Sequence, residues 1–408
     1  MLTYFDLALA LVMLFSAFMW FAILAMLRPL KKMKKELPES NNERVLLIIP
    51  CIYHERLQEN LSHFAQLEHP YLRAVFVTGT SHEPAADIVQ KVCSEYAHCH
   101  HVVAGEAKLC SQKNKNLLEG IKAHADYQAD VYLFCDDDCR PKQTEWISHF
   151  VAPLNNPKIG AVTSFRHVYL PENPKIADFL YFFATTYQRA SLRLTSSFVW
   201  GGAFAMTRRT FEEGKMAEKW GSTAVDDIVT SHAIMRSGKK IHFVQECMLH
   251  EDADPMTVPQ FQAWMTRQFQ YLYFYESWGY WLSFVMLAST LSSFVLLPLQ
   301  LSTGWFSSSM IPTAICFVSI CILGGTISFL AHGMKTSQKI ICALAIPLVV
   351  GSTVLGLINC MLTDLIKWKH KAYRIASDGS IAEVIDLVPS VPKASSTTKE
   401  DSSLQDIG

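Results

Sequence analysis

Three consecutive aspartates, Asp136, Asp137 and Asp138, directly follow the apolar run VYLFC at 131–135. Like charges side by side repel one another, so they do not stabilise a fold by themselves. In an extended segment Asp136 and Asp138 point to one face and Asp137 to the other. Two carboxylates on one face can hold a divalent cation such as Mg²⁺ or Mn²⁺ together with diphosphate oxygens. An acidic turn or a helix N-cap is the alternative interpretation.

A second acidic pair, Asp226 and Asp227, opens a helical pattern about 90 residues further along the chain. A carboxylate at a helix start that faces a crevice can act as a general base toward a hydroxyl group. The preceding pair Gly201 and Gly202 would allow the backbone to approach a ligand closely. A helix N-cap and a plain turn are the corresponding structural interpretations, and both stay open.

Aromatic residues dominate the segment Pro259–Trp281, which directly precedes a long apolar stretch. Such side chains favour the membrane interface, so the segment is predicted to be amphipathic and interfacial. Arg267 and its glutamine neighbours can reach a diphosphate or an acceptor head group from there. An interfacial anchor without a chemical role is the alternative.

The elements that must position these residues alternate between strand and helix patterns. Strands are expected at 45–50, 73–78, 101–103 and 131–135, and helices at 57–67, 85–96 and 113–124. This alternation predicts a parallel sheet covered by helices on both faces. Ligands of such sheets bind at the carboxyl ends of the strands, which is where the three aspartates follow their strand.

The chain has 408 residues, of which 50% are hydrophobic and 18% charged, an apolar composition for a soluble protein. The net charge of -1 gives no whole-chain bias toward nucleic acid. Uncharged stretches at 7–27, 282–301, 311–331 and 340–362 are each long enough to span a bilayer. The odd number of cysteines, 11, several of them within these stretches, indicates no disulfide framework.

A basic cluster follows the first apolar stretch and predicts an uncleaved anchor, with the next domain on the cytoplasmic side. This cluster comprises Arg28, Lys31, Lys32, Lys34 and Lys35. Three later spans would place Lys367, Lys369, Lys371 and Arg374 on the opposite side, against the same rule. A re-entrant or interfacial segment among those spans is therefore the alternative.

Taken in order, these motifs resemble the membrane glycosyltransferases with a GT-A fold, and most closely the ceramide glucosyltransferases and their bacterial lipid-glycosylating relatives. The resemblance covers most of the chain. It includes GEAKLCSQKNKNLLEG (Gly105–Gly120) and WKHKAYRIASDGSIAEVIDLV (368–388), which is similar to the family's C-terminal W-+-x-x-x-Y-R pattern.

The resemblance implies an α/β fold, with a GT-A (Rossmann-like) cytoplasmic domain inserted between an N-terminal transmembrane helix and a C-terminal transmembrane helix bundle. The expected boundaries are 1–28 for the anchor, 29–257 for the GT-A domain and 258–281 for the interfacial segment. About three transmembrane helices are expected over 282–366. A polar tail is expected over 367–408, disordered after Pro389.

The resemblance also implies roles for the candidate residues. Asp136 and Asp138 match the aspartates that bind the metal and the nucleotide sugar. Asp227, with Asp226 beside it, matches the catalytic base. Arg267 is expected at the catalytic site, and the donor pocket is assigned to Lys113, Asn116, Gly201, Gly202 and Gln262.

Two stretches depart from the family pattern. Its Q/R-x-x-R-W motif falls on WMTRQ (264–268), which retains Arg267 but ends in Gln268. In polymer-forming relatives the missing tryptophan lies by the acceptor, so a processive synthase is disfavoured. After the second strand, Gly79 or Thr80 stands where the family usually has an aspartate near the nucleotide base. Glu83 is then a weak candidate for that role.

The resulting hypothesis is transfer of a hexose from a nucleotide sugar, expected to be a UDP-sugar, to the hydroxyl of a membrane lipid such as ceramide. The mechanism would be inverting and would need Mn²⁺ or Mg²⁺. The protein would be a multi-pass integral membrane protein of a bacterial inner membrane or a Golgi or ER membrane, with its catalytic domain in the cytoplasm and no nucleic-acid partner. A processive polysaccharide synthase and a non-catalytic ligand-binding membrane protein are the alternatives.

Overall fold

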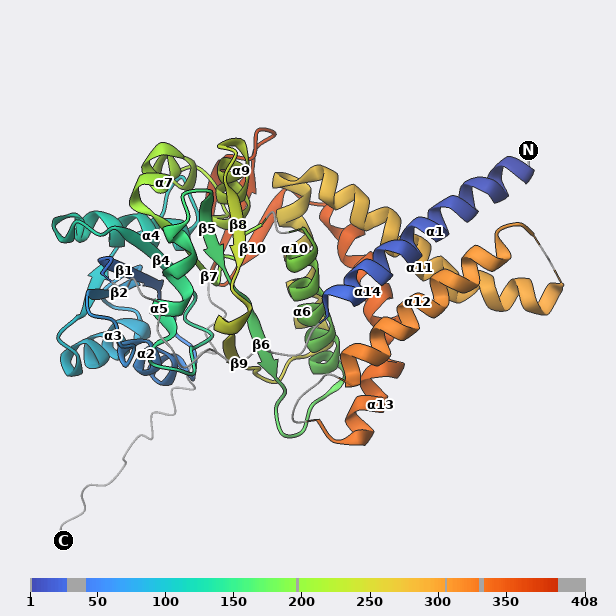
Figure 1. Ribbon diagram of the computed structural model, residues 1–408, viewed down its shortest axis with the longest axis horizontal. Coiled ribbons are helices and arrows are strands. Elements are labelled where there is room, and N and C mark those ends of the chain that lie inside the picture. The colour runs from blue at the N-terminus through green and yellow to red at the C-terminus, as the bar shows by residue number, and fades with distance from the viewer. Residues whose placement is uncertain (1, 28–41, 196–197, 305–306, 330–333, 388–408) are drawn as a thin grey trace, which may run out of the picture.

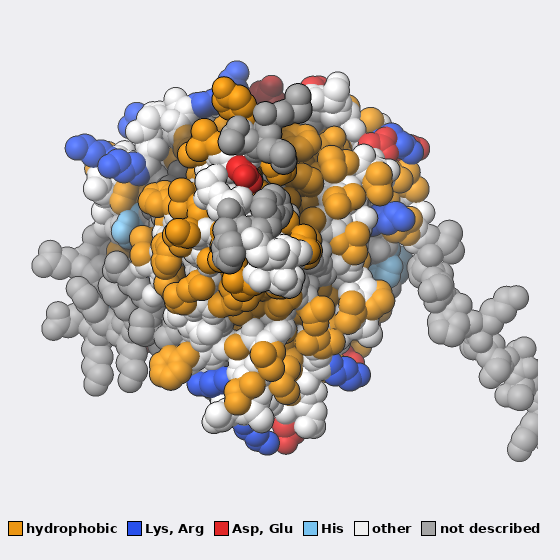
Figure 2. Space-filling view, turned by 90° about the vertical axis from the view of Figure 1, so that its right-hand side faces the viewer, with side chains coloured by type: hydrophobic (Ala, Val, Ile, Leu, Met, Phe, Trp, Pro, Cys, Tyr) orange, Lys and Arg blue, Asp and Glu red, His pale blue; other side chains and the backbone are white. Residues whose placement is uncertain are grey.

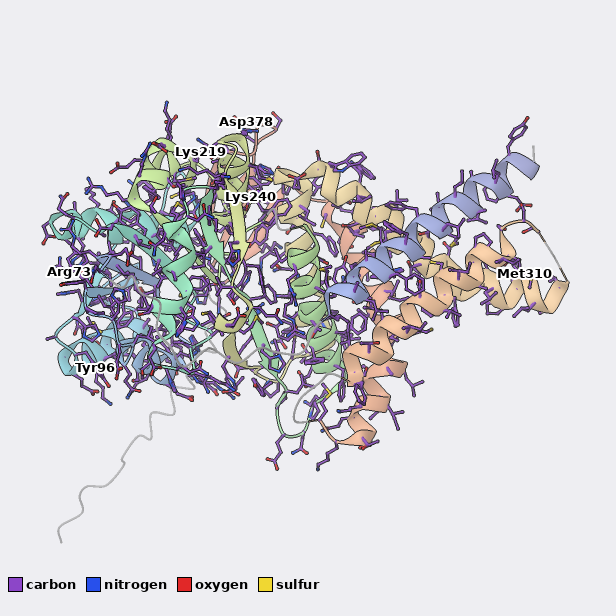
Figure 3. The ribbon with its side chains drawn as sticks, viewed as in Figure 1. Arg73, Tyr96, Lys219, Lys240, Met310 and Asp378 are labelled. Carbon is purple, nitrogen blue, oxygen red and sulfur yellow. The ribbon has the colours of Figure 1, made fainter. Side chains whose placement is uncertain are left out.

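The computed structural model describes residues 2–27, 42–195, 198–304, 307–329 and 334–387. An α/β domain and a group of apolar helices lie side by side along the long axis (Figure 1). In Figure 3, Arg73 and Tyr96 mark the end formed by the α/β domain, and Met310 lies toward the other end. The predicted basic cluster at 28–35 and the predicted disordered tail after Pro389 both lie outside the described residues.

Seven strands form the central sheet of the α/β domain. They are β1 (Val45–Pro50), β2 (Leu72–Thr78), β3 (Cys99–Val103), β4 (Val131–Cys135), β5 (Ile159–Thr163), β7 (Ala203–Thr207) and β8 (Lys240–Phe243). Their spatial order is β3-β2-β1-β4-β7-β5-β8. Neighbours are parallel except for β7, which runs antiparallel to β4 and β5. A separate parallel pair joins β6 (Arg166–Tyr169) to β9 (Leu249–Asp252). The predicted α/β fold with a mainly parallel sheet is confirmed.

Helices cover both faces of this sheet (Figure 1). They are α2 (Leu57–Ala65), α3 (Pro84–Glu95), α4 (Gln112–Ala123), α5 (Trp146–Val151), α7 (Arg208–Glu213), α8 (Met216–Trp220) and α9 (Asp227–Arg236), with short 3-10 turns η1 (Ala125–Tyr127), η2 (Ala152–Asn155) and η3 (Gln245–Cys247). In β1, Val45, Leu47 and Ile49 pack with α2, α3 and α5, whereas Leu46 and Ile48 pack with α4, α8 and α9 on the other face. This period of two explains why a continuous apolar run forms a strand buried on both sides.

The register of the sheet aligns the strand ends that bear the candidate residues. Pro50 of β1 pairs with Val77 of β2, and Ile48 of β1 pairs with Phe134 of β4. Because these three strands are parallel and nearly in step, the residues that follow them leave the sheet at one edge.

Among the described residues, three helices are long and apolar enough to cross a membrane: α1 (Leu2–Met26), α11 (Ser277–Thr303) and α12 (Met310–Phe329). The pair α13 (Thr336–Leu344) and α14 (Ile346–Cys360) passes the same test only together, and it is bent by 47°. Viewed from the helical end of the molecule, hydrophobic side chains form much of the visible surface (Figure 2). Buried polar contacts hold α1 against α11, since Ser16 Oγ lies 2.6 Å from Ser289 Oγ and Trp20 Nε1 donates to Thr290 Oγ1 at 2.8 Å.

Two further helices connect the α/β domain to the apolar helices: α6 (Ile176–Thr195) and α10 (Val258–Tyr275). The apolar residues 179–184 of α6 are buried in the same core as Phe261 and Met265 of α10. Helix α10 ends at Tyr275, and Glu276 adopts a non-helical conformation. Helix α11 begins at Ser277, five residues before the apolar stretch expected from Leu282. His232 of α9 forms a hydrogen bond with Glu276 at this break.

A three-stranded antiparallel sheet follows the last helix, with β10 (Leu365–Trp368), β11 (Lys371–Ile375) and β12 (Ile381–Asp386). The sequence predicts a polar tail over 367–408, which includes most of these residues. They fold because Ile366, Tyr373, Ile375 and Ile381 are buried against aromatic side chains of α10. The sheet is docked on the α/β domain (Figure 1).

Candidate active site

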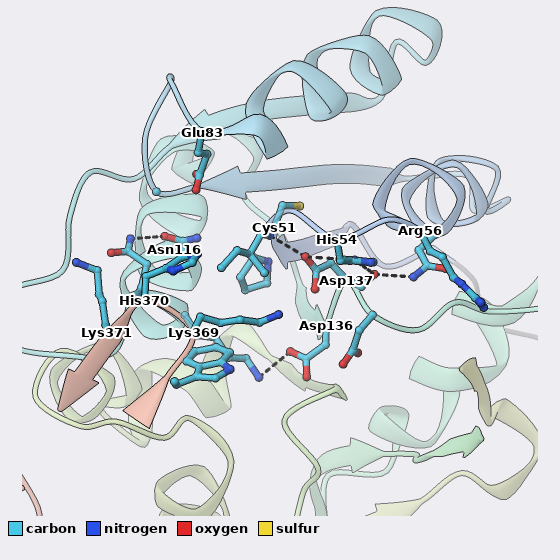
Figure 4. Close-up of a pocket in the computed structure, with 18 of the residues that line it drawn as sticks. Cys51, His54, Arg56, Glu83, Asn116, Asp136, Asp137, Lys369, His370 and Lys371 are labelled. Atoms are coloured by element: carbon cyan, nitrogen blue, oxygen red, sulfur yellow. Dashed lines mark hydrogen bonds and ion pairs between the residues drawn. The ribbon is translucent and has the colours of Figure 1, made fainter. Parts of the chain in front are cut away.

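A cavity of about 450 Å³ lies at the edge where β1, β2 and β4 end. Residues after each of these strands line it: Cys51 and Ile52, Gly79 and Thr80, and Asp136–Asp138. Helix α4 and the C-terminal sheet supply other walls of the cavity (Figure 4). The carboxyl edge of the sheet therefore carries the pocket, as expected for an open α/β sheet.

The three aspartates take three different environments. The Asp136 carboxylate pairs with Lys113 Nζ at 2.8 Å. Asp137 is buried and accepts a hydrogen bond from the backbone N–H of Ile52 at 2.7 Å, so it supports the fold. Asp138 has half of its side chain exposed, and its carboxylate lies 3.6 Å from Arg166. Asp136 and Asp138 are thus the two of the three that remain for a ligand.

Lys113 joins the two acidic motifs. It lies in the first turn of α4, and its side chain is 13% exposed. Its Nζ contacts Asp136 at 2.8 Å and Asp226 at 3.2 Å, and it donates to the carbonyl oxygen of Gly201 at 3.0 Å. Burial opposes its charge, but the carboxylates of Asp136 and Asp226 outweigh burial and raise the pKa of Lys113.

Asp227 is the first residue of α9, and its orientation is fixed by backbone donors. Its Oδ2 accepts from the N–H of Gly201 at 3.2 Å, and its Oδ1 accepts from the N–H of Ile228 at 2.7 Å. Burial raises the pKa values of both Asp226 and Asp227, against the lowering effect of Lys113. A carboxylate with a raised pKa is a better proton acceptor, which suits a general base.

The glycine pair lies behind this cluster rather than in the wall of the cavity. A Cβ at Gly201 would lie 3.0 Å from Lys113 Nζ, 3.1 Å from Asp226 Oδ1 and 3.2 Å from Asp227 Oδ2. A Cβ at Gly202 would clash with the ring of Trp200 at 2.2 Å. A side chain at position 201 would therefore crowd the lysine and both carboxylates.

The other predicted donor-pocket residues divide into two groups. Asn116 and Glu83 do line the cavity. Asn116 Nδ2 donates to the carbonyl of Val77 at 3.1 Å, and Glu83 Oε1 accepts from the N–H of Thr80 at 3.1 Å. Gln262 lies elsewhere, since its Nε2 donates to the carbonyl of Ser352 at 3.2 Å and so links α10 to α14.

Arg267 lies on α10, outside the cavity wall, one turn before Tyr271. Burial raises the pKa of Tyr271, and the charges of Arg267, Asp227 and Lys113 also act on its hydroxyl. The hydroxyl of Tyr271 thus lies within reach of the charges of both Arg267 and the acidic cluster.

The donor set at the pocket fits a hard divalent cation. Burial raises the pKa of Asp136 to about 6, with Lys113 acting against it, so this carboxylate is ionised at neutral pH. No group of three or more His, Cys, Asp or Glu side chains is arranged to hold a metal within the described ranges. Two carboxylates that leave the remaining positions to phosphate oxygens are the usual arrangement for a nucleotide-bound Mg²⁺. Asp136 and Asp138 are the residues that could hold the ion.

Two features of the site were not identified from the sequence. Arg166 forms an ion pair with Glu251 at 2.9 Å, and Tyr181 donates to Glu251 Oε1 at 2.7 Å. Burial raises the pKa of Glu251 to about 7 despite the arginine. The second feature is the wall formed by the β10–β11 turn, including Lys369. No local motif marks Arg166 or Glu251. The resemblance marked the segment 368–388 as a motif but not its place in the cavity wall, because the partners of both features are distant in the chain.

Comparisons with a family model and with solved structures both find glycosyltransferases. No curated protein matches the chain. Among solved structures, the chain resembles a mannosyltransferase from Pyrobaculum calidifontis in complex with GDP-Man and Mn²⁺. The two chains are 14% identical, with a TM-score of 0.50, and the match covers 89% of this chain and 98% of the mannosyltransferase. It is also similar over 56% of its length to 81% of a glucosyl-3-phosphoglycerate synthase from Mycobacterium tuberculosis, at 14% identity and a TM-score of 0.35. The first of these supports the GT-A type of fold that the sequence predicted. The family model of glycosyl transferase family 21 matches residues 8–381, which is nearly the whole chain. The protein therefore belongs to glycosyl transferase family 21.

Proposed function

We propose that the protein transfers a hexose from a nucleotide sugar, preferably a UDP-sugar, to the hydroxyl group of a membrane lipid such as ceramide. The donor would bind in the cavity at the edge of the sheet, with its diphosphate near Asp136 and Asp138. The acceptor hydroxyl would approach Asp227 from the side of α10.

The observation that carries this proposal is the contact of one buried ammonium with both acidic motifs. Lys113 touches Asp136, on the donor side, and Asp226, which is next to the candidate base. A transferase needs its leaving group and its base on either side of one sugar carbon, and this arrangement brings them together. A carboxylate cluster that served only as a surface turn would not enclose a buried lysine.

In the proposed reaction, Asp227 accepts the proton of the lipid hydroxyl. The oxygen then forms a bond to the anomeric carbon while the bond from that carbon to the diphosphate breaks, so the configuration inverts. The backbone N–H of Gly201 and that of Ile228 hold the carboxylate of Asp227 in place. When bound at Asp136 and Asp138, Mn²⁺ or Mg²⁺ supplies positive charge for the leaving diphosphate.

The position of α10 supports a lipid acceptor. This helix joins the α/β domain to the first apolar helix after it, and Gln262 ties it to α14. His232 of the base-bearing helix also bonds Glu276, where α10 ends and α11 begins. A hydroxyl at the head of a lipid would thus lie close to Asp227 while its chains stay among apolar helices.

Sugar transfer tests the proposal directly. Membranes containing the wild type, Asp227→Asn or Asp87→Asn would receive radiolabelled nucleotide sugars and total lipid extract, with Mn²⁺ or after chelation. Asp87 is a matched control because it also lies in the first turn of a helix but is exposed. A labelled lipid that needs metal and Asp227, but not Asp87, is the expected result. Labelled polymer would instead favour a processive synthase. Donor binding without transfer to any lipid would favour a non-catalytic protein.

A further inference from the structure

The C-terminal sheet contributes one wall of the donor cavity, although it lies more than 220 residues after the aspartate motif in the chain. Trp368, Lys369, His370, Lys371 and Tyr373 line the cavity together with Asp136–Asp138. Figure 4 shows Lys369 extending from the turn between β10 and β11 toward the side of the pocket where Asp136 lies. The wall therefore comes from a part of the chain that follows the apolar helices.

Buried contacts fix this wall to the nucleotide side of the domain. The Tyr373 hydroxyl accepts from the N–H of Gln112, the first residue of α4, at 3.2 Å. The N–H of Ile381 donates to the carbonyl of Ser222 at 2.9 Å. Tyr373 is only 2% exposed, and it packs in one cluster with aromatic residues of α10. The turn is consequently held at a defined height over the cavity.

The turn has an unusual backbone for its sequence. Trp368 pairs with Lys371, so only Lys369 and His370 connect the two strands. Lys369 has a φ of 55°, in the left-handed region where glycine is favoured and a side chain is strained. A glycine would fit the turn at lower conformational cost, but it would place no amine at the cavity.

Among the described residues, the charges that line the cavity leave Lys369 without an ion-pair partner. Eight carboxylates line it against four lysine or arginine side chains. Lys113 is paired with Asp136, Arg56 with Asp252 at 3.2 Å, and Lys371 with Asp386. Of the four cations, Lys369 alone forms no ion pair with any residue that the structure describes. Its charge nevertheless acts on His54 and Asp137 across the cavity.

We propose that Lys369 binds the diphosphate of the nucleotide donor, so that the C-terminal hairpin completes the donor site. This inference rests on the proposed function, since it concerns the same cavity. A dianionic group entering a cavity rich in carboxylates needs positive charge beyond that of one divalent ion. An exposed, unpaired ammonium on a docked turn supplies that charge with little loss of existing contacts.

Binding to the purified full-length protein tests this assignment. The dissociation constants of uridine, UDP and GDP would be measured with Mn²⁺ for the wild type, Lys369→Met, Lys369→Arg and Lys367→Met. Lys367 is a matched control because it lies two residues before Lys369, is exposed on β10 and does not line the cavity. We expect about tenfold weaker binding of the diphosphates to Lys369→Met, the loss of one charge-assisted hydrogen bond. Lys369→Arg and Lys367→Met should bind as the wild type does, and uridine binding should be unchanged in every variant.

Two results would overturn the assignment. The first is that Lys369→Met binds UDP and GDP as tightly as the wild type does. The second is that Lys369→Met binds uridine and UDP more weakly by the same factor, which would mean that Lys369 only shapes the wall. If the wild type binds neither UDP nor GDP, the proposed function itself fails. A measurement on the wild type covers the case in which Lys369→Met does not fold. Acetylation of Lys369, read by mass spectrometry, should be blocked by UDP with Mn²⁺ but not by uridine, while Lys367 reacts equally in both. Equal acetylation of Lys369 with and without UDP would refute the assignment.

Discussion

Replacing Lys113 by methionine tests whether its ammonium holds the two acidic motifs together. The substitution keeps the length of the side chain but leaves the carboxylates of Asp136 and Asp226 facing each other without a cation. Their side chains are 29% and 6% exposed, so water compensates for little of the loss. Removing one partner of a buried ion pair costs about 3–5 kcal/mol. For a domain of this size, that cost corresponds to a melting temperature lower by roughly 6–20 °C.

The cost should depend on pH. Lys113 lowers the pKa values of Asp136, Asp226 and Asp227, so its loss raises them further above their values in the unfolded chain. A raised folded-state pKa gives stability that is full below the unfolded value, near 4, and is lost as pH rises through the folded value. With Lys113 present the pKa of Asp136 is already about 6. As the pH rises from 6 to 8, the deficit of the variant should therefore widen, by at most about 1.4 kcal/mol per pH unit for each proton that its carboxylates retain and those of the wild type do not.

Thermal unfolding in detergent, followed by tryptophan fluorescence at pH 6 and pH 8, measures both effects. Lys115→Met is the matched control, because Lys115 lies on the same helix but forms its ion pair with Glu119 at a partly exposed site. Its loss should cost about 0.5 kcal/mol or less. Adding Asp226→Asn to Lys113→Met should recover part of the stability, since it removes one unpaired charge. A Lys113→Met protein that melts with the wild type at both pH values would refute the reasoning.

Three further predictions concern neighbouring residues. Asp227→Asn should lower transfer by about 10²–10⁴-fold while leaving UDP binding within about threefold, as measured by a rate assay and a binding titration. In the wild type, the rate of transfer should fall as the pH is lowered. The midpoint of the pH-rate profile should lie above that of an ordinary aspartate, because burial raises the pKa of Asp227. Gly201→Ala should reduce transfer because the added Cβ would crowd Lys113 and both carboxylates. Gly325→Ala should not, because a Cβ at Gly325 would have no neighbouring atom within 4 Å. Unchanged transfer in Gly201→Ala would count against the tight cluster. Tyr373→Phe should cost about 1 kcal/mol and weaken donor binding, because the N–H of Gln112 loses its acceptor; calorimetry and UDP titration together test this.

The sequence predicted the parts of the fold that follow from local pattern. The apolar runs before Cys51, Gly79 and Asp136 have the length and β-branched content of buried strands, and all three were confirmed with their helices. Strand β4 ends at Cys135, and Asp137 and Asp138 lie in a turn, so the alternation expected of an extended segment does not account for the directions of their side chains. Strand β7, antiparallel within the sheet, was not predicted, because its direction depends on tertiary pairing and not on its own residues.

The rest of the site depends on contacts between distant parts of the chain. Nothing near Lys113 in the sequence indicates that it meets Asp226, 113 positions later, and nothing near Gln262 indicates that it turns to Ser352. The β10–β12 sheet was missed because its strands are short and polar on one face, and its buried residues find their partners only on α10. Resemblance to a family supplied roles for these residues, whereas the structure supplied their neighbours.

The docking of the C-terminal sheet constrains how the chain passes through a bilayer. Tyr373 contacts Gln112 and Ile381 contacts Ser222, so the sheet and the α/β domain occupy one aqueous compartment. The chain between Glu276 and Leu365 must then cross the membrane an even number of times. If α11 and α12 each cross the membrane once, an even number of crossings requires the bent pair α13–α14 to enter and leave on the same face, as a re-entrant hairpin would. With that parity, the lysines that follow α14 would lie on the same side as the α/β domain, without the charge conflict that three full crossings would create.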